Sequence, residues 1–384
     1  RKKLLVTNPE DDPEGFKLLR EAYEEAIRLS KIEEEEKEDT PVSRWIEKVD
    51  SLYRSLSRRN NIDAWEELFQ EEVCRNFDTF EEVRDALLLY LMDHFRLSFD
   101  IWELINNTYH LPEIKEELYE KFPINFIDFV IRAPEADKWF DYKLFEGKED
   151  GDVDEFINCY YALRRMNDTK EYGEFHKVLD TIEKTNLWHP YLDVEKMIYY
   201  MNSNELETAK EIGQKLMERK YDNLFIKYYL MLLTMESGDI EKAYKEAEEI
   251  IKESPRHYGA RKAVYKYFYK KGDYKQSKEK LLELLEEWSY DQSLIEDLQK
   301  VNEHLIEIYK EQIEKEPENK KLKLELGWSL FQNNLFEECL NLIKDMELDD
   351  KIYYEYYNLM TRNYMVMENY EQAYPYAKIW LEEI

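Results

Sequence analysis

The sequence predicts an all-α protein in three parts: a short N-terminal segment, an irregular helical domain and a solenoid of helical repeats. Only 9 glycines and 10 prolines occur among the 384 residues, whereas an ordinary chain carries about 12% of the two together. Sheet-rich folds need these residues at their many turns, so the composition disfavours them. Hydrophobic residues make up 43% of the chain and aromatic residues 15%, which is enough for a sizeable core. A helical pattern also returns at a constant interval in the second half.

Residues 1–30 are predicted to hold the end of a basic helix, a polar loop and a second helix. The loop at residues 6–15 is acidic and contains two prolines, and Phe16, Leu19 and Tyr23 then follow at helical spacing. This run resembles the loop and third helix of a J-domain, the module by which DnaJ-type co-chaperones engage the seventy-kilodalton heat-shock ATPase. Because the chain starts at Arg1 inside a helical pattern, the resemblance covers a truncated J-domain, and we expect further sequence in front.

The J-domain signature His-Pro-Asp is altered in this chain, where Asn8, Pro9 and Glu10 occupy its positions. Asn8 lacks the titratable imidazole, and Glu10 is one methylene longer than Asp. The resemblance implies that this tripeptide would contact the ATPase, so we expect weak or absent stimulation. The acidic run that follows, residues 31–40, is predicted to be a solvated linker.

The domain predicted at residues 41–166 is helical without a clear period. Apolar stripes at helical spacing run through residues 45–56 and 80–95. Three prolines then divide the chain into short helices: Pro112, Pro123 and Pro134. Aspartates at 150, 152 and 154 are spaced as in a calcium loop, but the required Gly and distal Glu are missing. We therefore predict a capped helix start there.

A second resemblance supports the first. The irregular domain contains, in this order, Tyr53 and Arg58, the run Ile62–Leu68, Trp102, and the run Phe122–Ile124. Together they resemble the helical segment that follows the J-domain in some bacterial J-domain proteins, where it carries no known motif of its own. The segment stands in the expected place after the J-like N-terminus.

The repeats predicted at residues 167–384 are marked by turns that return at a constant interval. Their turn residues are Lys170, Asn204, Gly238 and Gly272 in one series, and Asn334 and Glu368 in a second. Gly and Asn at such turns can adopt a left-handed conformation that ends a helix. Small residues follow where two helices must cross closely, at Ala209, Ala243 and Ala373. These residues resemble the tetratricopeptide repeat, which has a period of about 34 residues and a unit of two antiparallel helices.

The repeat pattern departs from this period at one place. Gly272 and Asn334 are closer together than two full periods would place them. Residues 293–316 carry apolar side chains at helical spacing without a breaker, which predicts one long helix. The repeats are also degenerate, because Phe175 and Cys339 stand where the family favours Ala.

Charge and cysteine content limit the partners. With 86 acidic and 55 basic side chains, the net charge is −31. This charge disfavours binding to nucleic acid and to anionic membranes. No apolar run approaches the ~20 residues of a membrane span. The odd, widely spaced cysteines Cys74, Cys159 and Cys339 predict no disulfide framework, so we expect a cytoplasmic protein.

Local motifs for catalysis are missing from the sequence. The six histidines are scattered and never form a zinc-binding pair at i and i+4. The chain has neither a Gly-rich phosphate loop nor a Gly-x-Ser-x-Gly elbow. We therefore predict no enzyme activity, no cofactor and no metal. A site assembled from distant residues would leave no local motif in the sequence.

One basic stretch stands out against the acidic chain. Residues 255–280 carry nine Lys or Arg against two acidic residues. Lys262, Lys266 and Lys270 lie at i, i+4 and i+8 of a first repeat helix, on one face. By family resemblance they line the solenoid groove with Tyr269, and Tyr228 takes the corresponding position one repeat earlier.

Two interpretations of this stretch remain open. In the first, lysine ammoniums and tyrosine hydroxyls bind the carboxylates of an acidic peptide or chain terminus. In the second, the basic helix neutralises the glutamate-rich repeats on either side and binds nothing else. The sequence favours the second, because a chain of this charge gains by lowering its own repulsion.

Three hypotheses for function follow. The first is a non-enzymatic adaptor whose repeat groove binds a protein or peptide partner. The second is an active co-chaperone of the heat-shock ATPase, which Asn8 and Glu10 disfavour. The third is an enzyme with a dispersed site, for which the sequence nominates no residue.

The altered tripeptide generates a first prediction. Adding the chain to the heat-shock ATPase should leave ATP hydrolysis unchanged in a steady-state assay, because the His and Asp groups are lacking. The double substitution Asn8→His, Glu10→Asp should restore stimulation only where the remaining J-like surface is intact. Stimulation by the unaltered chain would favour the co-chaperone hypothesis over the adaptor.

Overall fold

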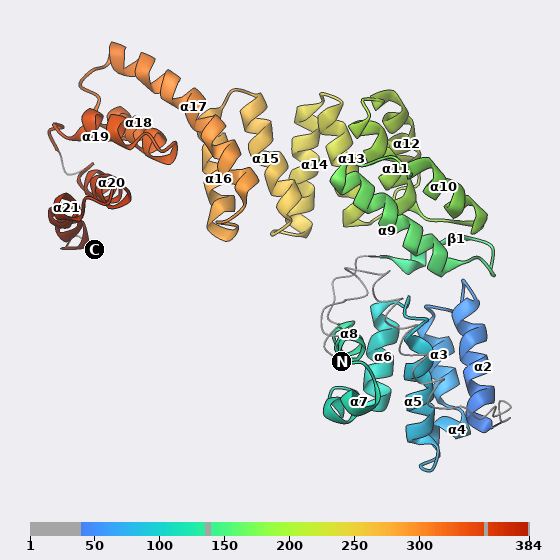
Figure 1. Ribbon diagram of the computed structural model, residues 1–384. Helices are drawn as coiled ribbons and strands as arrows, with labels where there is room; N and C mark the ends of the chain where they lie inside the picture. The colour runs from blue at the N-terminus through green and yellow to red at the C-terminus, as the bar shows by residue number, and fades with distance from the viewer. Residues whose placement is uncertain (1–39, 135–139, 349–351, 383–384) are drawn as a thin grey trace. The chain divides into compact units, whose positions relative to one another are not determined.

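The computed structural model describes residues 40–134, 140–348 and 352–382. The J-like segment with Asn8, Pro9 and Glu10, and the acidic run up to residue 39, lie outside these ranges. The described residues are helical apart from turns, loops and one pair of two-residue strands, which confirms the predicted all-α class (Figure 1). The chain divides between Ser203 and Asn204 into two compact units. The domain boundaries expected from the sequence stay a prediction.

The first unit begins with a bundle of helices around one apolar core. Its helices are α2 (Pro41–Arg54), α3 (Ile62–Phe69), α4 (Glu72–Arg75), α5 (Phe80–Leu91), α6 (Phe99–Tyr109), α7 (Lys115–Lys121) and α8 (Ile124–Arg132). Trp45 and Trp65 lie in the core, and their indole N–H groups donate to the backbone carbonyls of Leu68 and Arg59 at 3.1 and 2.8 Å. Each buried indole thereby keeps a hydrogen-bond partner.

A short connection links this bundle to the first repeat-like helices. It contains the 3₁₀ turn η1 (Tyr142–Leu144) and strand β1 (Glu146–Gly147), which pairs antiparallel with β2 (Leu187–Trp188). The helices that follow are α9 (Val153–Thr169), α10 (Phe175–Lys184) and α11 (Pro190–Asn202). The Asp152 carboxylate accepts from the backbone N–H of Glu155 at 3.0 Å and caps α9. This confirms the predicted helix start at the aspartate cluster.

A buried arginine joins the bundle to α9. Arg59 is 2% exposed, and its guanidinium lies 2.8 Å from both carboxylate oxygens of Asp154. The same guanidinium lies 3.6 Å from the ring centroid of Tyr53, whose hydroxyl donates to Asp154 at 2.8 Å. A buried charge of this kind is tolerated because it is both paired and hydrogen-bonded.

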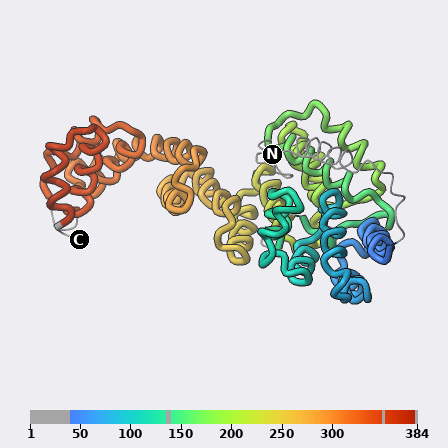
Figure 2. The backbone as a smooth tube through the Cα atoms, turned by 60° about the horizontal axis from the view of Figure 1, so that its bottom comes forward, coloured from blue at the N-terminus to red at the C-terminus, as the bar shows by residue number. Residues whose placement is uncertain are grey.

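The second unit is a series of helices, each packed against the next along the chain (Figure 2). They are α12 (Leu206–Glu218), α13 (Leu224–Glu236), α14 (Ile240–Glu253), α15 (Tyr258–Lys270), α16 (Tyr274–Glu287), α17 (Gln292–Lys315), α18 (Lys320–Gln332), α19 (Phe336–Ile343), α20 (Tyr353–Val366) and α21 (Tyr370–Glu382). The 24 residues of α17 confirm the long helix expected where the repeat period fails.

Left-handed backbone marks the repeat turns. The φ angles are 58° at Lys170, 60° at Asn204, 91° at Gly238, 76° at Gly272, 61° at Asn334 and 57° at Glu368. All six residues were expected to be turn positions, and both series keep the same interval along the chain. A left-handed residue ends one helix and lets the chain return antiparallel beside it.

A buried position follows each of these turns at the same distance along the chain. It holds Phe175, Ala209, Ala243, Ser277, Cys339 and Ala373, all of them 2% exposed or less. The two polar members are satisfied locally, because Ser277 Oγ donates to the Tyr265 carbonyl at 3.0 Å and Cys339 Sγ to the Gly327 carbonyl at 3.2 Å. Close helix crossing therefore tolerates Ser and Cys in place of Ala.

A buried carboxyl group lies between α9 and α11. Glu195 is 1% exposed, and Asn167 donates its amide to Glu195 Oε2 at 2.7 Å. Burial raises the pKa of Glu195 to about 7. His189, at the start of α11, is fully buried, and burial lowers its pKa to about 4.

The left-handed turns predict opposite effects of two substitutions. Gly238→Ala should lower the free energy of unfolding by about 1 kcal/mol, because a Cβ is disfavoured at positive φ. No atom lies within 4 Å of that Cβ, so the cost is conformational. Lys170→Gly should raise the free energy by up to about 1 kcal/mol for the same reason. Urea denaturation measures both.

Gly173→Ala serves as the matched control, because Gly173 also has open space around a Cβ but no positive φ. It should be neutral or slightly stabilising, since Ala restricts the unfolded chain. A loss for Gly238→Ala no larger than the control's would contradict the role of the turn.

The buried carboxyl predicts a pH-dependent stability of the first unit. The pKa of Glu195 is about 7 when folded, above its ordinary value of 4.5. The folded state therefore holds the proton more tightly, and stability falls as pH rises from about 4.5 through 7. Glu195→Gln should remove this loss and gain up to about 3 kcal/mol at pH 8.

Amide hydrogen exchange in α9 and α11, at pH 5.5 and pH 8, measures this gain. The contribution of His189 runs the opposite way, rising with pH from about 4 to 6.5. It cancels in the difference between variant and wild type. Glu183→Gln, at an exposed position of α10, is the control. Equal protection of wild type and Glu195→Gln at pH 8 would rule the effect out.

Candidate functional site

Helix α15 carries the residues that the sequence nominated for partner binding. Its first turn is capped by His257, whose Nδ1 accepts from the backbone N–H of Ala260 at 3.1 Å. Ala260, Ala263 and Tyr265 form its buried side. Helical spacing then places Lys262, Lys266 and Lys270 on another face, and these three residues are called the lysine stripe below.

Lys262 is the member of the lysine stripe whose ammonium has a hydrogen bond and a ring contact. Its ammonium donates to Ser293 Oγ on α17 at 2.9 Å. It also lies 5.1 Å from the ring centroid of Tyr258. This is a cation–π contact, and no carboxylate among the described residues pairs with the Lys262 ammonium.

Lys266 and Lys270 are exposed. Within the described residues, no hydrogen bond or ion pair reaches either ammonium. Desolvation by surrounding atoms lowers the pKa of Lys266, and the charge of Lys262 adds to this. The charges of Asp297 on α17 and Glu236 on α13 oppose the shift. The Lys266 side chain is therefore exposed to solvent, and charged groups on neighbouring helices act on it.

Asp297, the acidic group of α17 whose charge acts on Lys266, is already bound by other residues. Its carboxylate accepts from the Tyr265 hydroxyl at 2.7 Å and from Lys300 at 2.9 Å. These bonds help to hold the pKa of Asp297 below its ordinary value. Lys266 consequently forms no ion pair with a carboxylate among the described residues.

The two nominated tyrosines differ in their surroundings. The Tyr269 hydroxyl meets His304 Nε2 on α17 at 3.1 Å, and the His304 ring stacks on Tyr274 at 4.4 Å. Tyr228 is half-buried against the start of α15, where a Cβ on Gly259 would come within 2.4 Å of its ring. Tyr269 thus contacts α17, as Lys262 does, while Tyr228 packs α13 onto the start of α15.

Five other cations of the basic stretch form ion pairs within the chain. The nitrogen–oxygen distances are 3.1 Å for Arg256–Glu287, 2.5 Å for Arg261–Glu287, 2.6 Å for Lys271–Glu241, 2.8 Å for Lys275–Glu325 and 2.6 Å for Lys280–Glu283. Most of these carboxylates belong to neighbouring helices. Intramolecular neutralisation therefore accounts for these five cations and not for the lysine stripe.

Lys278 belongs to neither group. Its ammonium donates to Ser329 Oγ on α18 at 3.0 Å. Burial lowers the pKa of this lysine to about 8, and nearby Glu325 opposes the shift. Lys278 is a packing residue between repeats, since Ser329 is fully buried.

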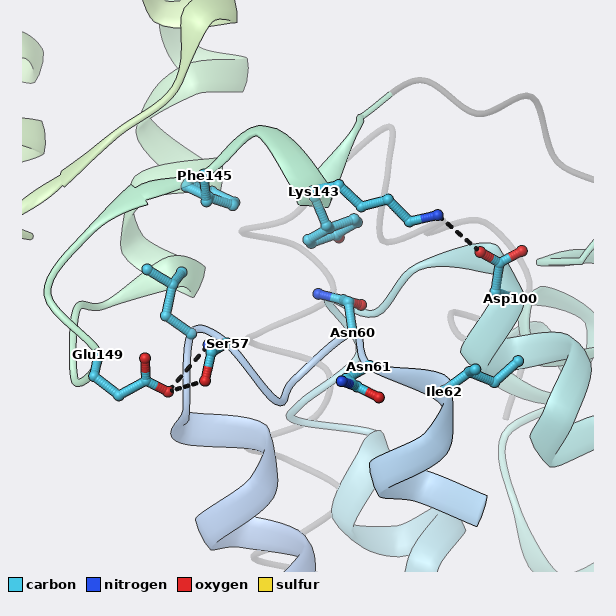
Figure 3. Close-up of a pocket in the computed structure, with 10 residues that line it drawn as sticks. Ser57, Asn60, Asn61, Ile62, Asp100, Lys143, Phe145 and Glu149 are labelled. Atoms are coloured by element: carbon cyan, nitrogen blue, oxygen red, sulfur yellow. Dashed lines mark hydrogen bonds and ion pairs between the residues drawn. The ribbon is translucent and has the colours of Figure 1, made fainter. Parts of the chain in front are cut away.

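Sequence reasoning missed a second candidate site, a cleft of about 510 Å³ in the first unit (Figure 3). It is lined by Leu56, Ser57, Asn60, Asn61, Ile62, Asp100, Tyr142, Lys143, Phe145 and Glu149. These residues come from three separate parts of the chain. The only local signal was the pair Asn60-Asn61 directly before an apolar helix.

Other chemistry is limited in the part of the chain that the structure describes. There, no three His, Cys, Asp or Glu side chains gather closely enough to hold a metal ion. Burial raises the pKa of the Cys159 thiol to about 11 and those of Cys74 and Cys339 to about 12. Every helix in the described ranges is too short or too polar to span a bilayer.

The fold and its two candidate sites define a helical-repeat protein with a separate N-terminal bundle. The family described as "DjlB/C second domain" matches residues 43–136, about a quarter of the chain. This match lies within the range predicted for the irregular helical domain, residues 41–166. It supports the resemblance of that domain to the segment that follows the J-domain in bacterial J-domain proteins.

Two solved structures were found to be similar in part. PilF of Pseudomonas aeruginosa is 15% identical, with 49% of this chain and 88% of that chain covered and a TM-score of 0.27. MamA from AMB-1 is 14% identical, with 50% and 90% covered and a TM-score of 0.22. Similarities this weak add nothing to the description of the fold. No curated protein matches the chain.

Proposed function

We propose that the chain is a non-enzymatic scaffold that binds an acidic protein segment along the lysine stripe of α15. The observation that carries this proposal is the contrast between two sets of cations. Five cations of the basic stretch have carboxylate partners at 3.1 Å or closer. Lys266 and Lys270 have none among the described residues, although the chain carries a net charge of −31.

The spacing of the lysine stripe suits an extended peptide. Successive lysines at i and i+4 are separated by about 6 Å along the helix axis. Alternate side chains of an extended peptide lie about 6.6–6.8 Å apart on one face. Acidic residues at every second position would therefore each meet one ammonium. Charge-assisted hydrogen bonds of this kind are the stronger class.

The residues around the lysine stripe add to recognition. Tyr269 is held by His304, and Lys262 is held by Ser293, so both side chains are already ordered before a partner binds. Side chains fixed in advance lose less conformational entropy on binding. A helical-repeat solenoid also offers an extended surface for peptides.

We also propose that the scaffold is cytoplasmic and is associated with a chaperone system. The family match over residues 43–136 supports a relation to DnaJ-like proteins. The three cysteines are unpaired and buried, which suits a reducing compartment. We expect the scaffold to bring an acidic partner to that system rather than to stimulate the heat-shock ATPase itself.

The charge of the lysine stripe is tested by reversing it. The double substitution Lys266→Glu, Lys270→Glu should weaken binding of a fluorescein-labelled acetyl-Glu-Leu-Glu-Leu-Glu-amide peptide by at least about tenfold, because two charge-assisted contacts become repulsive. Fluorescence anisotropy with the full chain, at low and physiological salt, measures the change. The wild-type affinity should fall as salt rises.

Lys245→Glu is the matched control, since this exposed lysine of α14 lies outside the lysine stripe but undergoes the same reversal of charge. Lys245→Glu should weaken peptide binding much less than Lys266→Glu or Lys270→Glu does alone. Equal weakening by both would mean that only net charge matters, and the assignment of the site would fail.

A further inference from the structure

The cleft of the first unit has a chemistry different from that of the lysine stripe. It lies between the turn that joins α2 to α3, the first turn of α6, and the connection that contains η1 and Glu149. Asp100 and Glu149 give its lining two carboxylates, against the single ammonium of Lys143. An acidic peptide is therefore disfavoured here.

One wall of the cleft is held in place by hydrogen bonds. The backbone N–H of Leu56 donates to the Glu149 carbonyl at 2.9 Å. Glu149 Oε1 accepts from the Ser57 backbone N–H at 3.0 Å, from the Ser57 hydroxyl at 2.7 Å and from the Ser55 hydroxyl (Figure 3). These bonds lower the pKa of Glu149, so its carboxylate is charged at neutral pH.

Two asparagine amides face this cleft in a fixed orientation. Asn60 Oδ1 accepts from the backbone N–H of Ser98, and Asn61 Oδ1 accepts from that of Ala64 at 3.2 Å. A backbone N–H can only donate, so each amide must present its oxygen to it. Each NH₂ group then has no acceptor among the described residues. Two donors of known direction are left for a ligand with carbonyl oxygens.

The opposite side of the cleft offers a loosely paired carboxylate. Asp100 lies 3.8 Å from the Lys143 ammonium, and the side chains are 36% and 77% exposed. An exposed pair at this distance contributes little to stability. A ligand cation would displace Lys143 from Asp100 at small cost.

Apolar side chains complete the lining. Leu56 lies in the turn between α2 and α3, Phe145 lies in the connection, and Ile62 is 41% exposed at the start of α3. Figure 3 places Asn60 and Asn61 between Glu149 on one side and Asp100 on the other. The cleft thus combines amide donors, carboxylates and an apolar surface within one opening.

We propose that this cleft binds an extended peptide segment that carries an arginine or lysine side chain. The peptide carbonyls accept from Asn60 and Asn61, the cationic side chain pairs with Asp100, and an apolar neighbour covers Ile62. This site goes beyond the proposed function, because it lies in the other unit and selects the opposite charge.

The test uses the full chain at physiological salt and a labelled acetyl-Leu-Arg-Leu-Arg-Leu-amide peptide. In the Lys266→Glu, Lys270→Glu variant, which lacks the acidic-peptide site, this peptide should bind at least tenfold more tightly than a labelled acetyl-Leu-Glu-Leu-Glu-Leu-amide peptide. Asn61→Ser keeps a good helix cap but removes the NH₂ donor, and should weaken binding about fivefold. Asp100→Asn should weaken binding about tenfold and reduce its salt dependence.

Asn319→Ser is the matched control. Asn319 lies outside the cleft and caps α18 in the same way as Asn61 caps α3, because its Oδ1 accepts from a backbone N–H. It should leave binding unchanged, as should the double substitution in the lysine stripe. Circular dichroism checks that each variant is folded. Equal affinities for Asn61→Ser and Asn319→Ser would overturn the proposal, and so would equally tight binding of free arginine amide.

Discussion

The repeated left-handed turn is the constraint on which the rest of the solenoid depends. A residue with φ between 58° and 91° ends one helix at Lys170, Asn204, Gly238 and Gly272, always at the same interval along the chain. Each turn sends the chain back antiparallel, and a residue in the next helix becomes a buried contact between helices. Where the period is lost between Gly272 and Asn334, no residue of this described stretch has a left-handed φ, and α17 continues for 24 residues. Helix lengths and crossings in the repeats thus follow from where the backbone can turn.

The cations of the basic stretch differ in whether a carboxylate of the chain pairs with them. In the basic stretch at residues 255–280, four of the nine cations pair with glutamates of neighbouring helices, which lowers the repulsion within an acidic chain. The lysine stripe differs because Asp297, the α17 carboxylate whose charge acts on Lys266, already binds Tyr265 and Lys300. Net charge alone could not have separated these two groups of lysines. Their difference arises only when α17 is packed against α15.

The sequence predicted those features that depend on local spacing. The turns, the long helix α17 and the shared face of Lys262, Lys266 and Lys270 all follow from intervals along the chain. It predicted neither the pairing of Arg256 and Arg261 with Glu287 nor the cleft around Asn60, because these join residues from distant segments without a period. Phe175 illustrates the same limit. A large ring in a slot expected to hold Ala fits because it stacks on Tyr199 at a centroid distance of 4.0 Å.

The buried Arg59 has a consequence for how the first unit would respond to a ligand. Arg59 directly precedes Asn60 and Asn61 in one short turn, and its bond to Asp154 fixes that turn to α9. A shift of the asparagines would therefore be resisted by a buried ion pair. If a ligand in the cleft alters this turn, its binding and the attachment of the bundle to α9 are thermodynamically linked, and each changes the other by the same coupling free energy. The helical bundle and the first repeat-like helices would act as a single cooperative body.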